Sequence, residues 1–547
     1  MAHLALLPPE ILHNIFRWLG PVDLLLLPFV CRIFRHHVEG NRALFHDAYR
    51  LLLDVPGEDV VLDWEAEVRR VARLESICRR ATSAEKKPEL EFVSETVDRL
   101  LRLARSHGRT TDNSHTHAVS YNAELLARLF KEPSTRDAFL HRSFLFERVR
   151  GDGDALCLAD PPNREHQLSA KLHCLYGRPI LNLGRLRSTR TYPFAVSKVY
   201  DLRHYTTRTR WGPFLNDGSD GVDWEKVEAI LIVLGYNLTL RRVVKLFADV
   251  WDSPFSGNWP RSYVSSPGLS LRPLEASDPY GVTGTWYRVI CFLDFNDFFK
   301  FNFPVGPAFG HASNVPRPPL NVGEATRLIV MRIHVTSVEP PGPEDGQSLP
   351  VVHFKGMSRS LDDSWDDNAN SDIRALACKG TVRLTRQGEV RWTTVSIVHG
   401  EERWRSEGVQ LGGVQSARGV VGNWFDNGYD DQGPAGPTAF WKATDSKAAS
   451  DTIHDLFTDN FLVAYNTMAY MEDSDPEAEM DYEVQDDDDE EAEVDEDIDS
   501  EPIASEIPGL LLDAQLDVGE LRLTELLRRL PELCRRHNTR PLSQPSI

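Results

Sequence analysis

The sequence predicts an α+β protein: an amino-terminal three-helix segment and a helical region, followed by an antiparallel β-barrel and a disordered acidic tail. Apolar residues recur at helical spacing as far as about residue 255, whereas from residue 286 they alternate along the chain. From Glu472 to Glu501 there are 19 acidic residues and no lysine or arginine, a composition that cannot bury a core. The 547 residues predict several domains, because one domain usually holds about 100–200.

The net charge of −21 is concentrated in this acidic segment. Outside it, 61 basic residues stand against 63 acidic ones, a net charge of −2. Such a body lacks the basic field that holds a phosphate backbone, which argues against nucleic-acid binding as the main activity. The seven cysteines stand singly, and the sequence contains neither a secretory signal nor an apolar run of about 20 residues. We therefore expect a protein of the cytoplasm and/or nucleus that does not enter membranes.

Residues 8–45 predict three short helices. Pro9 suits the first helical position, and Gly20-Pro21 supplies a stop. Between them one wide apolar stripe is formed by Ile11, Leu12, Ile15, Phe16 and Leu19. About forty residues cannot close a core of their own, so this stripe predicts a protein partner.

The next two parts of the chain differ in period. Residues 51–275 predict a mainly helical region, and residues 276–445 predict nine short strands separated by Gly, Pro, Asp and Asn. The expected strands are 286–295, 299–303, 329–335, 351–355, 381–386, 390–398, 404–411, 418–425 and 438–442. Short strands without helices between them are typical of an antiparallel barrel or sandwich.

A repeated motif favours the barrel. Residues 281–287 and 419–425 both read G-V-x-G-x-W-aromatic, one near the first strand and one near the last. If these two strands meet, they close the sheet, with a tryptophan plugging an end of the interior; chance similarity is the alternative. Beyond the barrel we expect a helix at 446–470, an acidic disordered segment at 471–506 and a carboxy-terminal helix at 507–547.

Residues 5–50 strongly resemble an F-box. The resemblance is carried by Leu7-Pro8-Pro9-Glu10-Ile11-Leu12, Ile15-Phe16, Leu19, Asp23-Leu24, Val30-Cys31-Arg32 and Phe34. It implies docking on the Skp adaptor of a Skp-cullin-F-box ubiquitin ligase, and hence association with the cullin scaffold. The contact candidates that it implies are Pro8, Ile11, Leu12, Ile15, Leu19, Leu24 and Val30.

The strand region carries a second resemblance. Residues 278–281, 404–410 and 436–441 look like the carboxy-terminal region of fungal F-box proteins. They are also distantly similar to the lipocalin-like barrel behind the F-box in the cyclin-directed branch of F-box-only proteins. Both likenesses imply a substrate-recognition module.

Cationic and aromatic residues cluster within the expected strands. Arg391, Arg403, Arg405 and Trp404 are candidates for substrate binding, because arginine and tryptophan dominate binding hot spots. The alternative is that Trp392 and Trp404 fill the barrel while the charges pair across strands.

Motifs for catalysis are not found. The sequence contains no phosphate-binding glycine loop, no HExxH and no GxSxG, and His115 with His117, or Cys157 with His166, His173 and Cys174, lack zinc-site spacing. We expect no cofactor and no metal, and a non-catalytic adaptor subunit that presents a protein substrate. The alternatives are a ligand-sensing lipocalin-like receptor, which needs an apolar cavity of about 300 Å³ or more, and an F-box protein acting outside ubiquitin transfer.

Overall fold

The computed structural model describes residues 4–55, 61–104, 107–109, 117–150, 163–176, 190–240, 274, 277–304, 316–360, 376–398, 400–414, 416 and 419–442. Chain contacts divide the protein into two compact units, 1–461 and 462–547. The expected helix at 446–470, acidic segment at 471–506 and helix at 507–547 lie outside the described residues.

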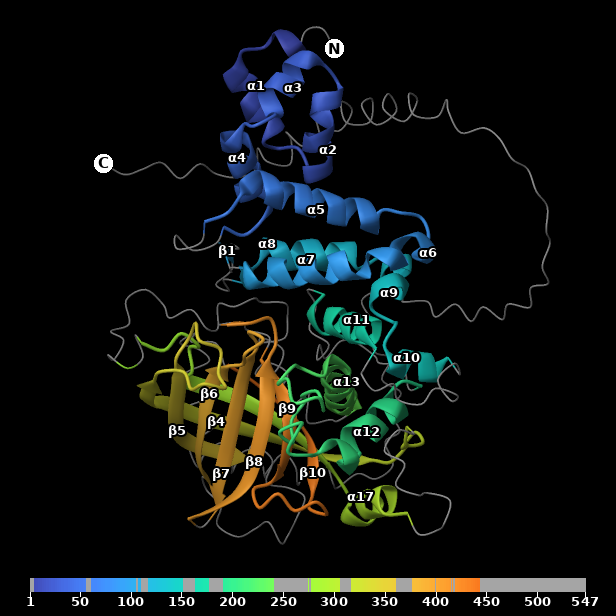
Figure 1. Cartoon of the computed structure of the whole chain (residues 1–547), viewed down its shortest axis with the longest axis vertical. Coiled ribbons are helices and arrows are strands. Elements are labelled where there is room, and N and C mark those ends of the chain that lie inside the picture. The colour runs from blue at the N-terminus through green and yellow to red at the C-terminus, as the bar shows by residue number, and fades with distance from the viewer. Residues whose placement is uncertain are drawn as a thin grey trace, which may run out of the picture. The chain divides into compact units, whose positions relative to one another are not determined.

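The amino-terminal helices are α1 (Pro9–Phe16), α2 (Pro21–Leu26), α3 (Arg32–Val38) and α4 (Arg42–Leu52), with 3₁₀ turns at Leu4–Leu6 and Leu27–Phe29 (Figure 1). Pro9 and Pro21 each occupy the first helical turn, where a missing N–H breaks no helical hydrogen bond. Phe16 and Phe34 are buried, and their rings meet edge to face with centroids 5.0 Å apart. The three predicted helices are confirmed, and α4 follows them.

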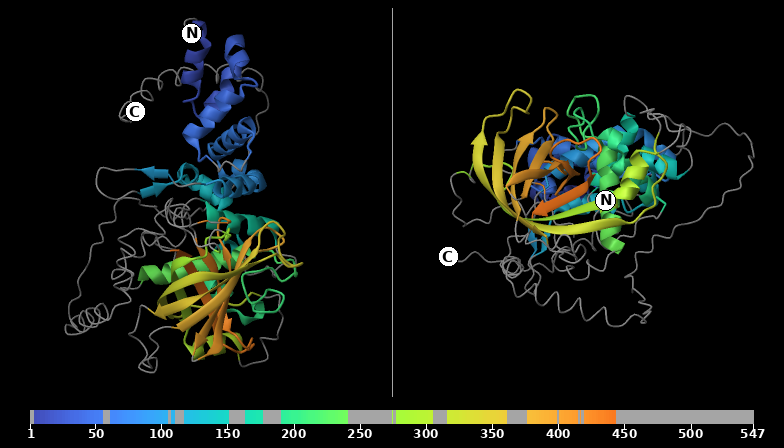
Figure 2. Two further views of the ribbon diagram at one scale, coloured as in Figure 1. Left: turned by 90° about the vertical axis from the view of Figure 1, so that its left-hand side faces the viewer. Right: turned by 90° about the horizontal axis from the view of Figure 1, so that it is seen from below.

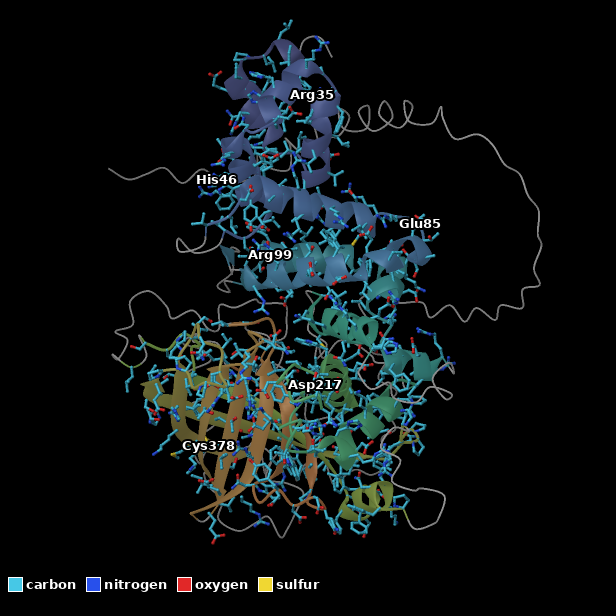
Figure 3. The ribbon with its side chains drawn as sticks, in the orientation of Figure 1. Arg35, His46, Glu85, Arg99, Asp217 and Cys378 are labelled. Carbon is cyan, nitrogen blue, oxygen red and sulfur yellow. The ribbon has the colours of Figure 1, made fainter. Side chains whose placement is uncertain are left out.

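The region after α4 is mainly helical, as predicted. Its elements are α5 (Trp64–Cys78), α6 (Ser83–Lys86), a 3₁₀ turn (Lys87–Glu89), α7 (Leu90–Arg102), β1 (His107–Arg109), β2 (His117–Val119), α8 (Tyr121–Leu129), α9 (Pro133–Phe139), α10 (Phe144–Val149), α11 (Arg164–Leu175), α12 (Tyr192–Tyr200), a 3₁₀ turn (Leu202–His204) and α13 (Trp224–Leu240). Between α7 and α8 lies a small antiparallel pair, β1 with β2. Arg99 of α7 (Figure 3) contacts Glu67 of α5, with an Nε–Oε1 distance of 2.9 Å.

Eight antiparallel strands form a closed barrel in the order β10-β3-β4-β5-β6-β7-β8-β9, which confirms the predicted fold class (Figures 1 and 2). They are β3 (Gly284–Leu293), β4 (Glu324–Glu339), β5 (Val351–Ser360), β6 (Leu376–Leu384), β7 (Val390–Val398), β8 (Glu401–Gln410), β9 (Val420–Asp426) and β10 (Ala435–Lys442).

One of the nine predicted strands, at residues 299–303, is wrong. Residues 299–303 belong mostly to helix α17 (Phe295–Asn302), which Asp294 begins by accepting a hydrogen bond from the Asn296 N–H. Phenylalanines at every second position suggested a strand, but the residues that become buried are Phe298 and Asn302, four apart on one helical face. The N-cap and this spacing outweigh the apparent alternation.

The barrel does not close where the repeated motif predicted, which was between the two strands that carry it. The two motif strands, β3 and β9, do not pair with each other, because β10 lies between them and pairs with both. Trp286 of the first motif is fully buried in the barrel interior. Trp424 of the second motif donates from Nε1 to the carbonyl of Cys291, at 2.9 Å.

Aromatic side chains fill one part of the barrel interior. The Trp286 and Trp392 rings lie 5.0 Å apart, and Trp392 also contacts Phe354 and Phe440 at centroid distances of 5.7 and 5.5 Å. The indole Nε1 of Trp392 donates to Gln410 at 3.0 Å. Trp392 is therefore a core residue, which confirms the alternative interpretation for this tryptophan.

The outer face of the barrel has two different halves. Helices α12 and α13 pack on β9, β10, β3 and β4, and they bury outward side chains such as Tyr287, Val289 and Trp441. The outward side chains of β5–β8 are largely charged or hydroxylated. This second half carries the groove described next.

Candidate functional site

Large apolar side chains are exposed on the amino-terminal helices. Phe29 is 79% exposed, Ile11 is 45% exposed, and Leu6, Trp18 and Ile33 are also exposed. In water such side chains gain about 2 kcal/mol each when a partner covers them fully. This set is suited to a protein contact.

The seven predicted adaptor contacts occupy three kinds of position. Pro8 and Ile11 are exposed, Ile15 and Val30 are half-buried, and Leu12, Leu19 and Leu24 are buried inside the helical segment itself. The three buried leucines therefore support the surface from below. Phe29 and Ile33, which are also exposed on this segment, are not among the contacts that the F-box resemblance implies.

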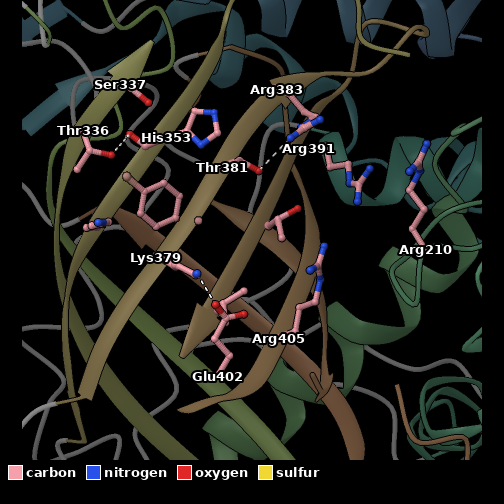
Figure 4. Close-up of a pocket in the computed structure, with 15 residues that line it drawn as sticks. Arg210, Thr336, Ser337, His353, Lys379, Thr381, Arg383, Arg391, Glu402 and Arg405 are labelled. Atoms are coloured by element: carbon pink, nitrogen blue, oxygen red, sulfur yellow. Dashed lines mark hydrogen bonds and ion pairs between the residues drawn. The ribbon is translucent and has the colours of Figure 1, made fainter. Parts of the chain in front are cut away.

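A groove of about 710 Å³ lies on the outer face of β4–β8 (Figure 4). Its cationic lining residues are Arg210, Lys355, Lys379, Arg383, Arg391 and Arg405, and we call this cavity the basic groove. Among the lining residues that the structure describes, Glu402 is the acidic one. The groove is thus built to face negative charge.

Strand register arranges the floor of the basic groove in rows. On one row Lys355 of β5 lies opposite Lys379 of β6. On another, Arg383 of β6 lies opposite Arg391 of β7. Between the two rows lie the hydroxyl-bearing Thr381 and Thr393, which are also opposite each other. All of these side chains point the same way, because residues two apart share a face of the sheet.

The buried Glu407 forms ion pairs with two of the arginines of the basic groove. Its carboxylate is 1% exposed and accepts from Arg391 and Arg405, each at 2.8 Å, on different oxygens. The Thr393 hydroxyl also donates to it, at 3.0 Å. The arrangement fixes both guanidinium groups and leaves one positive charge in excess.

Arg210 reaches the basic groove from the loop between α12 and α13. Its guanidinium makes a forked contact with Asp220, with an NH2–Oδ2 distance of 2.6 Å, which holds the pKa of Asp220 below its usual value. Arg210, Trp211 and Asp220 have φ angles of +50°, +59° and +60°, a left-handed conformation that costs energy for these residues. The loop is held there by Trp211, whose ring lies 5.3 Å from that of Phe425.

The predicted substrate-binding residues separate in the structure. Arg391 and Arg405 line the basic groove, whereas Arg403 and Trp404 do not. Trp404 packs edge to face on Trp424 with centroids 5.5 Å apart, and the Arg403 guanidinium lies 5.2 Å from the Trp404 ring. Sequence alternation can place Lys379 and Arg383 on one face, but no local signal connects Arg210 to this barrel.

Comparison with known families identifies the amino-terminal segment. The F-box domain family matches residues 4–46, which include α1, α2 and α3. The chain is therefore an F-box protein. F-box domains bind the Skp adaptor in Skp-cullin-F-box ubiquitin ligases, typically as non-catalytic subunits that recognise substrates. No curated protein and no solved structure matches the chain, and the lipocalin-like resemblance of the barrel receives no support from these comparisons.

Two further features complete the description of the site. In the part of the chain that the structure describes, no group of three or more His, Cys, Asp or Glu side chains is placed to hold a metal ion. None of the described helices is long and apolar enough to cross a membrane.

Proposed function

We propose that this protein is the substrate-recognition subunit of a Skp-cullin-F-box ubiquitin ligase. Its F-box docks on the Skp adaptor and so joins the cullin scaffold, and its barrel presents a protein target bound in the basic groove. The observation that carries the proposal is an F-box in the same compact unit as a barrel with a 710 Å³ basic groove.

The mechanism is proximity. Docking brings the bound target close to the ubiquitin-charged enzyme, so the gain is in effective concentration, and no residue of this chain needs to make or break a bond. The exposed Leu6, Ile11, Phe29 and Ile33 offer about 8 kcal/mol of gross apolar burial, before the costs of association.

The packed interior supports an outer-face site over a ligand chamber. Trp286, Trp392, Phe354 and Phe440 meet inside the barrel at the distances given above, where a ligand-sensing receptor would need open space. The basic groove has that space on the outside.

The docking surface can be tested with two exposed apolar residues. We expect Ile11→Asp combined with Phe29→Asp to abolish co-elution with the purified Skp adaptor in size-exclusion chromatography, because two charges would be desolvated at the interface. Both residues are exposed, so the F-box itself should stay folded. Substituting the buried Leu12 would instead disrupt the helical core.

Ala43→Asp is the matched control, since Ala43 is exposed in the first turn of α4, where an acidic residue is tolerated. It should co-elute like the wild type. Undiminished adaptor binding by the double variant would refute F-box docking through this surface. The ligase role is supported over one outside ubiquitin transfer by two results together. The double variant binds no adaptor, and the wild type supports ubiquitin transfer to the proteins that it captures.

The basic groove can be tested by substrate trapping in cells. The Ile11→Asp and Phe29→Asp variant should retain targets that it cannot pass to the ligase. We expect added Arg405→Ala to release those targets while the thermal melt changes little, because Glu407 keeps Arg391 and Thr393 as partners. Lys300→Ala, on the exposed face of α17, serves as the control. Unchanged trapping by Arg405→Ala would place recognition elsewhere.

A further inference from the structure

The basic groove contains two pairs of like charges placed directly opposite each other. Lys355 faces Lys379, and Arg383 faces Arg391, in the register of neighbouring strands. Like charges in such positions destabilise a sheet. Their presence in one groove is therefore explained better by a ligand of opposite charge than by the stability of the barrel.

The charges of the basic groove do not cancel. Arg210 is paired with Asp220, Arg383 with Asp345 and Lys379 with Glu402, which leaves these pairs neutral. Two positive charges remain without a matching carboxylate among the described residues. Arg391 and Arg405 share the single carboxylate of Glu407, and Lys355 has no ion-pair partner among the described residues. Counted over the described residues, the groove therefore has two positive charges to offer.

The two like-charged rows are too far apart for one small anion. Lys379 and Arg383 are four residues apart on β6, which corresponds to about 13 Å along a strand. A single carboxylate or phosphate group is only about 3 Å across by hydrogen-bond geometry, so it reaches one row. An extended peptide reaches both if its acidic side chains are also four residues apart, since these share a face.

One end of the basic groove already holds a carboxylate of the protein itself. Lys379 forms its ion pair with Glu402 (Figure 4), and this contact lowers the pKa of the Glu402 carboxyl. Glu402 is exposed, so an incoming carboxylate can take its place or share Lys379 with it. This position thus accepts a carboxylate in the geometry shown.

We propose that the basic groove binds an extended acidic segment of the target protein in which two carboxylates lie four residues apart. One carboxylate lies between Lys355 and Lys379, and the other lies between Arg383 and Arg391. The segment runs along the strand direction, over Thr381 and Thr393. This inference rests on the proposed function, because it names the substrate class of the same groove.

The test uses labelled peptides and the full chain. Three peptides of eleven residues, built from serine and threonine, carry two glutamates that are adjacent, two apart or four apart, so that net charge is constant. A fourth carries a single phosphoserine. Binding is measured by fluorescence polarisation at low salt, because exposed charge pairs are screened within about 10 Å at 0.1 M. We expect the peptide with glutamates four apart to bind about fivefold more tightly than the adjacent one.

Variants separate spacing from general attraction. Lys379→Gln or Arg383→Gln should remove the preference for glutamates four apart, because only one row remains. Lys300→Gln, which removes one exposed lysine from α17, should keep it. Equal affinity for all three spacings in the wild type, or loss of the preference in Lys300→Gln, would overturn the inference. Tighter binding of the single phosphoserine would overturn it in favour of a phosphopeptide.

The experiments distinguish a failure of the acidic-segment inference from a failure of the proposed function. If spacing has no effect while trapping still depends on Arg405, the acidic-segment inference falls and the substrate site stands. If the preference for glutamates four apart is found but the adaptor does not bind the wild type, the groove specificity is supported and the ligase role falls.

Discussion

Trp392→Ala is expected to unfold the barrel or lower its stability by about 3–5 kcal/mol. The indole is 1% exposed and contacts three other aromatic rings, those of Trp286, Phe354 and Phe440. Removing it leaves a cavity among these rings, and also leaves Gln410 without the 3.0 Å hydrogen bond from Nε1. Chemical denaturation followed by circular dichroism measures the loss.

Trp404→Ala is the matched control for this substitution. Trp404 is half-buried, and the ring contact that the structure gives it is with Trp424, apart from the guanidinium of Arg403. Its truncation should cost clearly less than that of Trp392. Trp392→Phe should lie between the two, because it keeps a ring but loses the hydrogen bond. A Trp392→Ala protein as stable as wild type would disprove the packed-core description of the barrel.

Glu324→Ala is expected to give the second large loss, about 4 kcal/mol. The Glu324 carboxylate is 2% exposed and accepts from the hydroxyl of Tyr192 at 2.5 Å, from the Asn237 amide at 2.6 Å, and from the hydroxyl of Tyr200. Burial and the nearby charge of Glu324 raise the pKa of both tyrosines, so they remain donors. Without the carboxylate, the two tyrosine hydroxyls lose this acceptor and the Asn237 amide keeps only its bond to the Val233 carbonyl, at about 1–3 kcal/mol for each hydrogen bond lost.

This carboxylate joins the barrel to the helices, because Tyr192 and Tyr200 belong to α12 and Asn237 to α13. Limited proteolysis should therefore cut the helical region of Glu324→Ala faster than that of the wild type, besides the lower unfolding midpoint. Glu339→Ala removes an exposed glutamate from the other end of β4. It should change the free energy of unfolding by less than about 0.5 kcal/mol, and so leave the midpoint nearly unchanged. Equal midpoints for the two variants would show that Glu324 is not a structural clamp.

Local patterns predicted much of the fold. The helical spacing of Ile11, Leu12, Ile15 and Phe16 and the stop at Gly20-Pro21 indicated the first helices. A short run of strand-forming residues between turn residues indicated β7 at the residues where the structure has it. These signals are local, because a helix or strand buries one face at a fixed period. Where two periods were both possible, as in residues 299–303, the capping residue Asp294 decided for the helix.

The predicted adaptor contacts differ in exposure, which their positions in the sequence did not indicate. The F-box resemblance grouped Leu12, Leu19 and Leu24 with Pro8 and Ile11, but the three leucines pack inside the helices. The most exposed apolar residue of the segment, Phe29, lies in a 3₁₀ turn, where no helical period marks it.

The sequence by itself determined the F-box, the helical region and the succession of strands, because each depends on residues close together in the chain. Only the tertiary structure decided that β10 closes the barrel between β3 and β9, and that Arg383 lies opposite Arg391. It also decided that Arg210, more than 150 residues earlier in the chain, joins them in one groove. Strand register and loop packing depend on contacts between distant segments, and a one-residue shift would turn every side chain of a strand to the other face.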